Sequence, residues 1–267
     1  MNRQSNVYTV IYSIVLVAVV GVVLSVVYQA LRPAQLENIA NDTKRQILAS
    51  ARLTPGPGED VSSLFDKHII SSYIVNSQGD QIDPSTNPFD VNVSLEVKKP
   101  ADERLLPVFE CTTNAGLKYI VPVYGAGLWG PIWGYVAFDN NGNTIYGAYF
   151  AHQGETPGLG AEIEKPAFSG QFDGKDIFSN GQFTSVAVVK LGKEPAGQAW
   201  VHAVSGGTIT SQGVQKMLFD SLEPYTAFFM ALQNAQTLPA QIAEETQPAT
   251  EFSGEDFTGE GLEPQEL

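Results

Sequence analysis

The chain has few of the residues from which metal centres and disulfides are built. A single cysteine, Cys111, excludes an internal disulfide and any iron–sulfur or zinc site made from several thiolates of this chain. The three histidines, His68, His152 and His202, are far apart in the sequence and match no metal-ligand spacing. We therefore predict no metal site, and we expect Cys111 to be a small, buried core residue.

Positive charge is also scarce. The 15 Lys and Arg residues stand against 29 Asp and Glu, for a formal net charge of −14, which argues against a general nucleic-acid binder. The last 24 residues hold eight of the acidic residues and no Lys or Arg. This composition predicts an acidic, disordered tail over residues 241–267.

No charged residue occurs between Gln4 and Leu31, where Val, Ile, Leu and Tyr dominate. Since about 20 apolar residues suffice to cross a bilayer, residues 1–32 predict a single transmembrane anchor. A cleaved signal peptide is the alternative, but its apolar region usually runs about 7–15 residues and ends at small residues, which the segment from Tyr28 to Pro33 matches poorly. Basic residues flank both ends of the span, so the charges do not decide its orientation.

The residues after the anchor predict a connector and then an α+β domain. Helical spacing of apolar residues, followed by the Pro- and Gly-rich stretch Thr54 to Gly58, predicts a helical connector over residues 33–58. A soluble domain is expected over residues 59–240. Its predicted strands cover residues 69–75, 80–82, 91–97, around 109, 119–124, 132–138, 146–150 and 182–190. The last of these is almost entirely apolar and is expected to be central in its sheet.

Two turns and two helices complete the predicted domain. Asn141-Gly142 predicts a tight hairpin between the strands on either side of it, because this pair supplies the positive φ angles of such a turn. Residues 161–165 are expected to begin a short helix. Apolar residues from 214 to 232 recur at helical spacing, and Pro224 should split that helix near Glu223.

The stretch Ser205-Gly206-Gly207-Thr208-Ile209-Thr210-Ser211 combines two glycines with four hydroxyl residues where a helix is expected to begin. Glycines and free helix-start N–H groups suit a phosphate. No Gly-Lys-[Ser/Thr] follows the glycines, and neither a Gly-x-Ser-x-Gly elbow nor a Ser-x-x-Lys pair is present here, so nucleotide phosphate loops and serine hydrolases are not indicated. Taken alone, the stretch is typical of an ordinary helix cap.

A second loop changes this interpretation. Together, Gly154-Glu155-Thr156-Pro157-Gly158-Leu159-Gly160 and Ser205-Gly206-Gly207-Thr208 resemble the FMN-binding domain of the flavin-carrying subunits of sodium-translocating NADH:quinone reductases and of the related Rnf complexes. The resemblance is closest to the family formed by the C subunits of the sodium-translocating reductases. It covers the anchor and, most specifically, residues 127–218, with a flavin-binding part at about 127–235.

The resemblance implies that FMN is bound covalently, its phosphate esterified to Thr208 by a dedicated flavin transferase, with Ser205, Gly206 and Gly207 giving clearance. It also implies that Glu155, Thr156, Leu159 and Gly160 line the ring or its polar edge, that Lys190 is a partner for the flavin's polar atoms or phosphate, and that Trp129 lies near the ring. Members of the family usually have Asp where this chain has His202, and Ala where it has Gly207.

The function expected from this resemblance is electron relay, without substrate chemistry, inside a multi-subunit NADH:quinone reductase. The other membrane subunits would be its partners. The soluble domain would be periplasmic, on a single-pass anchor in a bacterial inner membrane. Two alternatives stay open: an Rnf-type subunit with the same fold, and an anchored binding or scaffold domain without flavin, in which the Thr208 stretch only caps a helix.

Overall fold

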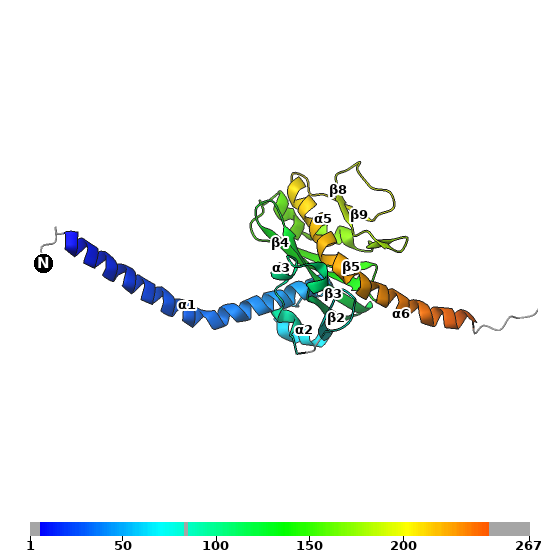
Figure 1. Cartoon of the computed structure of the whole chain (residues 1–267), viewed down its shortest axis with the longest axis horizontal. Helices are drawn as coiled ribbons and strands as arrows, with labels where there is room; N and C mark the ends of the chain where they lie inside the picture. The colour runs from blue at the N-terminus through cyan, green and yellow to red at the C-terminus, as the bar shows by residue number, and fades with distance from the viewer. Residues whose placement is uncertain (1–5, 83–84, 246–267) are drawn as a thin grey trace, which may run out of the picture.

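The computed structural model describes residues 6–82 and 85–245 (Figure 1). A long helix, α1, leads into an α+β domain, and a second long helix, α6, leaves the domain on another side (Figure 1). The predicted tail at residues 246–267 lies outside the described residues. Helix α6 runs to Glu245 and so continues past the tail boundary predicted at residue 240.

Helix α1 is one continuous element, Asn6–Ser50, where the sequence predicts an anchor and a separate connector. It is long and apolar enough to cross a membrane, and we treat its first part as the candidate membrane span. Pro33 lies inside it, and the helix changes direction partway along (Figure 1). Proline removes one helical hydrogen bond and crowds the preceding turn, which explains a bend without a break.

The domain is built around a five-stranded antiparallel sheet in the order β1-β2-β3-β4-β5, which confirms the predicted fold class. The strands are β1 (Ile69–Val75), β2 (Leu106–Thr113), β3 (Gly116–Ala126), β4 (Pro131–Asp139) and β5 (Ile145–His152). The predicted hairpin is also confirmed: Gly142 has a φ of 63° in the turn between β4 and β5.

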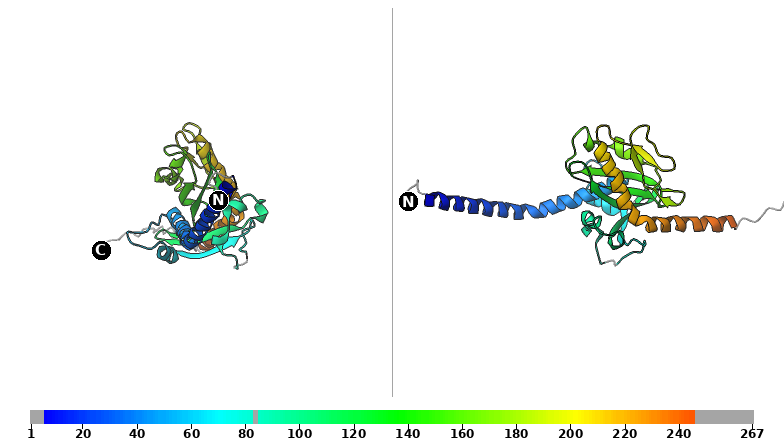
Figure 2. Two further views of the ribbon diagram at one scale, coloured as in Figure 1. Left: turned by 90° about the vertical axis from the view of Figure 1, so that its left-hand side faces the viewer. Right: turned by 45° about the horizontal axis from the view of Figure 1, so that its top comes forward.

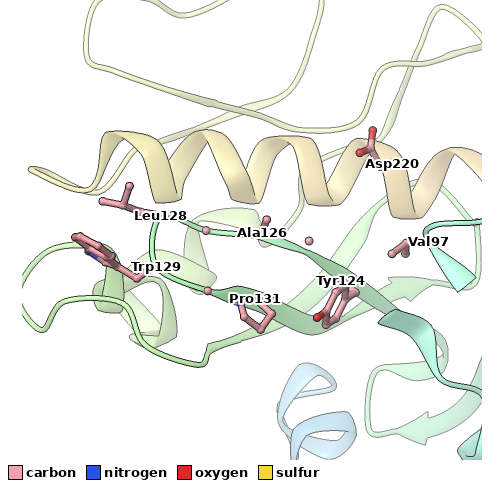
Figure 3. A pocket seen from close by; sticks show the side chains of 10 residues that line it. Val97, Tyr124, Ala126, Leu128, Trp129, Pro131 and Asp220 are labelled. Carbon is pink, nitrogen blue, oxygen red and sulfur yellow. The ribbon is translucent and has the colours of Figure 1, made fainter. Parts of the chain in front are cut away.

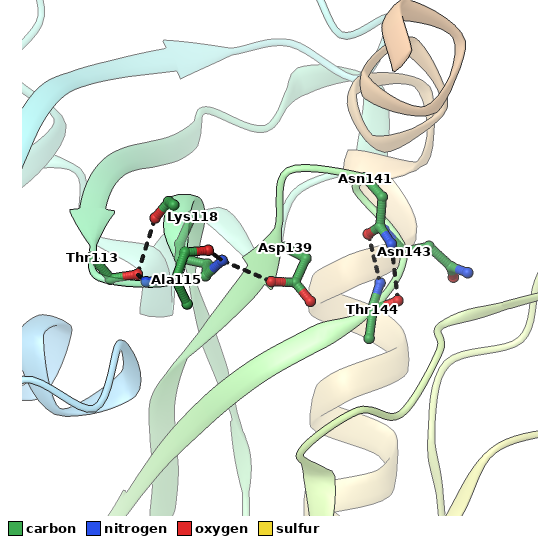
Figure 4. Close-up of polar contacts among 8 residues, drawn as sticks. Thr113, Ala115, Lys118, Asp139, Asn141, Asn143 and Thr144 are labelled. Atoms are coloured by element: carbon green, nitrogen blue, oxygen red, sulfur yellow. Dashed lines mark hydrogen bonds and ion pairs between the residues drawn. The ribbon is translucent and has the colours of Figure 1, made fainter. Parts of the chain in front are cut away.

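Polar side chains fix this end of the sheet. The Asn141 side-chain oxygen accepts hydrogen bonds from the N–H groups of Asn143 and Thr144, at 2.9 and 3.0 Å (Figure 4). Lys118 on β3 lies 2.9 Å from the Asp139 carboxylate at the end of β4, and it also donates to the Ala115 carbonyl (Figure 4). These contacts hold the hairpin in register next to the preceding turn.

Alternate residues of each strand point to opposite sides of the sheet, and a cluster of buried side chains covers each side. Val108, Val121 and Val136 face the larger cluster, which includes α5 (Thr208–Leu222). Phe109, Cys111, Ile120 and Ala137 face a second cluster made with α2 (Val61–His68) and the end of α1. Figure 2 shows α5 on one side of the sheet and the end of α1 on the other. The sheet is therefore the middle layer of the domain.

The end of α1 belongs to this core. Ile47, Leu48 and Ala51 are buried in the second cluster, and Trp133 on β4 donates its indole N–H to the Gln46 side chain at 3.1 Å. The last turns of the predicted connector are thus a structural part of the domain.

Cys111 is fully buried, as predicted, and burial raises the pKa of its thiol to about 11. At pH 8 the thiolate fraction is then only about one in a thousand, and the sulfur is also out of reach of solvent. We expect a thiol-reactive dye to leave the native chain unlabelled at pH 8 over a period in which the urea-unfolded chain reacts completely. Equal labelling rates in the two states would contradict the burial.

Two predicted strands are wrong. Residues 91–97 contain the short helix α3 (Val93–Glu96), which turns the Glu96 carboxylate inward and leaves Leu95 exposed. The two Glu96 oxygens accept hydrogen bonds from Lys99 Nζ at 2.8 Å and Leu105 N at 3.0 Å, which satisfy the buried carboxylate. Residues 80–82 form a single bridge, between Val75 and Gln81, in place of a strand.

The apolar stretch at 182–190 is not a central strand. Ser185 has a φ of 57°, which divides the stretch into β7 (Gln182–Phe183) and β8 (Ala187–Val189). Each belongs to a small two-stranded sheet: β7 pairs with β6 (Phe178–Ser179), and β8 pairs in parallel with β9 (Trp200–His202). The stretch is apolar because β8 packs under α5, whose Gln215 side chain accepts from Val188 N at 2.9 Å.

The remaining elements are short, apart from the C-terminal helices. They are η1 (Pro88–Asp90), η2 (Ala101–Glu103), η3 (Gly160–Glu164), α4 (Pro166–Ser169) and η4 (Gly170–Phe172). The predicted break at Pro224 is confirmed, since α5 ends at Leu222 and η5 (Glu223–Tyr225) separates it from α6 (Thr226–Glu245).

Candidate functional site

Three loops meet at the start of α5: the turn between β3 and β4, the loop after β5, and the loop after β9. Thr208 is the first residue of α5 and is half-buried. Gly207 occupies the N-cap position, so no cap side chain bonds the first-turn N–H groups. A helix of 15 residues with an uncapped N-terminus is suited to a phosphate.

The loop before Thr208 contacts the loop after β5. Gly206 has a φ of 73°, and a Cβ added there would lie 2.6 Å from Leu159 Cδ2. A Cβ on Gly207 would lie 3.3 Å from the Gly160 Cα. The two glycines therefore allow a close approach that larger residues would push apart. The structure brings together the two loops that the sequence singles out.

Glu155 connects these loops to the β3–β4 turn. One carboxylate oxygen accepts from the Trp129 backbone N–H at 2.8 Å, and the other accepts from the Thr210 hydroxyl at 2.5 Å. Its side chain is buried, with 4% exposed. The sequence singles out Glu155 and Trp129 but not Thr210, because a hydroxyl in the first turn of a helix looks like an ordinary capping residue.

Two of the loops carry large apolar side chains that are open to solvent. Trp129 is 69% exposed and Leu159 is 43% exposed. Trp129 and Leu128 lie at one end of a groove of about 600 Å³ that runs beside α5 (Figure 3). The groove continues past Ala126 and Tyr124 to Asp220 and Val97 (Figure 3). Exposed aromatic and aliphatic groups on loops that meet at an uncapped helix start suit a ligand with a phosphate and a flat ring.

Lys190 and Thr156 lie at the edges of the site. Because β8 and β9 are parallel, their ends lie together: Ala203 N donates to the Val189 carbonyl at 2.8 Å, which places Lys190 beside the loop that leads to Thr208. Lys190 is exposed and forms no ion pair with another described residue. Thr156 is exposed, and its carbonyl accepts from Leu159 N and Ala161 N, so it shapes the loop.

His202 lies on the surface at the end of β9. Its ring is exposed and lies 5.1 Å from the Trp200 ring, between centroids. Its backbone N–H donates to the Gln171 side-chain oxygen at 2.9 Å, and its carbonyl accepts from the same amide group at 3.4 Å. The departure from the family pattern at this position therefore changes a surface side chain. The backbone of His202, which leads to Thr208, stays hydrogen-bonded to Gln171.

Helix α5 is pressed against β3 at Gly213, where an added Cβ would overlap with the Ala126 carbonyl oxygen. We expect Gly213→Ala to lower the free energy of unfolding by about 2 kcal/mol, because overpacking against backbone outweighs the gain of about 1 kcal/mol in helix propensity. Chemical denaturation measures this change. Gln212→Ala on the exposed side of the same turn is the control and should be neutral or slightly stabilising; a stabilised Gly213→Ala chain would contradict the close packing.

The comparison with known proteins agrees with this geometry. A family profile described as "FMN-binding domain" matches residues 127–223, which contain all three loops. The chain thus carries an FMN-binding domain behind a candidate membrane span. The C subunit of the Na(+)-translocating NADH-quinone reductase from Vibrio anguillarum is 31% identical over 230 residues, covering 80% of this chain and 89% of the relative. Its counterpart from Pseudomonas aeruginosa is 31% identical, covering 81% and 91%. The chain belongs to the family of the C subunits of Na(+)-translocating NADH-quinone reductases.

Solved structures support the same assignment. The structure of the C subunit from Parabacteroides distasonis is 47% identical and superimposes with a TM-score of 0.69, covering 74% of this chain and 96% of that one. The structure of NqrC from Shewanella oneidensis is 29% identical with a TM-score of 0.60, covering 72% and 97%.

Proposed function

We propose that this chain is a membrane-anchored electron-relay subunit of a sodium-translocating NADH:quinone reductase, with FMN linked through its phosphate to Thr208. The observation that carries the proposal is the meeting of three loops around a threonine at an uncapped helix start. When bound, FMN supplies the one- and two-electron chemistry; the protein supplies its position and surroundings.

Each part of the site has a role in this proposal. The backbone N–H groups at the start of α5 would stabilise the phosphate charge. Gly206 and Gly207 let the loop before Thr208 lie close to Leu159 and Gly160. Lys190 would provide a positive charge from the neighbouring strand end. Trp129 and Leu159 would contact the ring, since both expose apolar surface on loops that meet at the start of α5. A covalent link keeps the cofactor in place between electron transfers without altering the ring itself.

The proposal also includes partners and location. The chain would be placed in a bacterial inner membrane by α1, with its domain on the periplasmic side, where a flavin transferase modifies Thr208. The other membrane subunits of the reductase would donate and accept the electrons. The names of the relatives favour this complex over an Rnf-type complex.

The test is to produce the full chain together with its flavin transferase, denature it in detergent and examine it for fluorescence. The tryptic peptide Glu194 to Lys216 contains Thr208 and should carry the mass of FMN less one water, with fragmentation assigning it to Thr208. A chain that loses all flavin on denaturation would refute the covalent link, and a native chain without flavin would favour the scaffold alternative. Subunits that co-purify with the chain would separate the two types of complex.

A further inference from the structure

The carboxylate of Glu155 is buried, with 4% of the residue exposed, and it contacts three segments of the chain. A Cβ on Gly127 would overlap with one of its oxygens, and a Cβ on Gly160 would overlap with the other and with the Thr210 hydroxyl. Its two hydrogen-bond donors, Trp129 N–H and Thr210 O–H, come from segments far apart in the sequence. Both oxygens therefore already have partners within the protein.

No described Lys or Arg pairs with this buried carboxylate. Its stabilisation comes from the two hydrogen bonds and from its position beneath the first turn of α5, where the helix dipole favours negative charge. The Glu155 backbone is held in turn, since its N–H donates to His152 Nδ1 at 3.1 Å at the end of β5. The loop is thereby fixed to the sheet on one side and to α5 on the other.

We propose that Glu155 is a positioning residue, which holds the Trp129 turn and the start of α5 at a fixed separation. The consequence of this role for the flavin rests on the proposed function. The phosphate would bind at the start of α5, and the ring would contact Trp129 on the turn. The Glu155 carboxylate would therefore set how the two ends of the flavin are aligned. The flavin's polar edge would then meet other groups, because Glu155 is buried, with only 4% exposed.

Four variants separate the two hydrogen bonds of Glu155, one to the Trp129 turn and one to α5. Glu155→Ala removes both. Glu155→Gln can keep both, because its carbonyl oxygen accepts from Trp129 N–H and its NH₂ group donates to the Thr210 oxygen. Thr210→Val removes only the link to α5 with little change in shape, and Thr210→Ser is its matched control because it retains the hydroxyl.

The first measurement needs no flavin. In the full chain produced without the transferase, hydrogen exchange of the Trp129 amide reports its bond to Glu155 directly. We expect Glu155→Ala to accelerate this exchange about tenfold or more, because it removes one charge-assisted hydrogen bond from the Trp129 amide. In Glu155→Gln the exchange rate should stay much closer to that of the unmodified chain. Unchanged protection of the Trp129 amide in Glu155→Ala would overturn the proposal, whether or not the chain carries flavin.

The second measurement uses the flavin-loaded chain. We expect Glu155→Ala and Thr210→Val to shift the visible absorption band and the midpoint potential of the flavin, and Thr210→Ser to leave both unchanged. A residue with only a structural role would lower the melting temperature without moving either property. If Glu155→Ala does not fold, the Thr210 pair decides: identical spectra and potentials in Thr210→Val and Thr210→Ser would overturn the proposal.

Discussion

Thr208→Ala is expected to abolish the flavin that survives denaturation while leaving the chain folded. The Thr208 side chain is half-buried, and its hydroxyl makes no hydrogen bond to another described residue, so its removal should disturb little. Alanine also suits the first turn of a helix. The melting temperature should therefore stay near that of the unmodified chain, and in-gel fluorescence after denaturation should fall to background.

Neighbouring hydroxyl residues provide the controls for this result. Thr208→Ser keeps an oxygen at the same place and should retain at least part of the covalent flavin. Ser205→Ala should keep all of it. Ser211→Ala should also keep it but lose about 1 kcal/mol of stability, because the Ser211 oxygen accepts from Val204 N at 3.0 Å. Fluorescence that persists in Thr208→Ala would show that another residue carries the link.

Leu48→Ala is expected to destabilise the domain by about 2–5 kcal/mol, although Leu48 lies at the end of a helix that begins in the candidate membrane span. Its side chain is 0% exposed and packs in the cluster beneath the sheet. Thermal unfolding of the full chain in detergent measures this loss. A chain that starts at residue 54 lacks Ile47, Leu48 and Ala51 together and is expected to be largely unfolded.

Leu36→Ala on the same helix is the matched control. Leu36 is 57% exposed and lies outside both core clusters, so its replacement should change the free energy of unfolding by no more than about 0.5 kcal/mol. If the two leucine variants melt at the same temperature, the end of α1 does not contribute to the core.

Local signals in the sequence predict most of the sheet. Short apolar runs predict β1, β3 and β4, the Asn141-Gly142 pair predicts one hairpin, and Pro224 predicts the break before α6. Each of these depends on residues that are close together in the chain. The candidate site is predicted because the rare loop at residues 154–160 gives meaning to the otherwise ordinary stretch at residues 205–211, and the structure then shows the two loops in contact.

The prediction errors arise where contacts between distant parts of the chain decide the secondary structure. The apolar run at 182–190 is buried by α5, so burial there does not mean a central strand, and the left-handed Ser185 that divides it has no sequence signal. The seven residues at 91–97 are too short for alternation to exclude a helical turn. The link from Glu155 to Thr210 spans 55 residues, and only the assembled fold brings the two together.

Because α1 runs without interruption from the apolar span into the core, it fixes how the domain is rotated about the helix axis relative to that span. Each residue in an α-helix turns the chain by about 100° and advances it by about 1.5 Å. One residue inserted between Leu36 and Asn41 would therefore turn Thr208 by about 100° around the helix axis, a little over a quarter of a turn, whereas seven residues would return it to nearly the same bearing about 10 Å farther out. The direction in which Thr208 faces, relative to the apolar span, is thus set by the number of residues in a helix far from it.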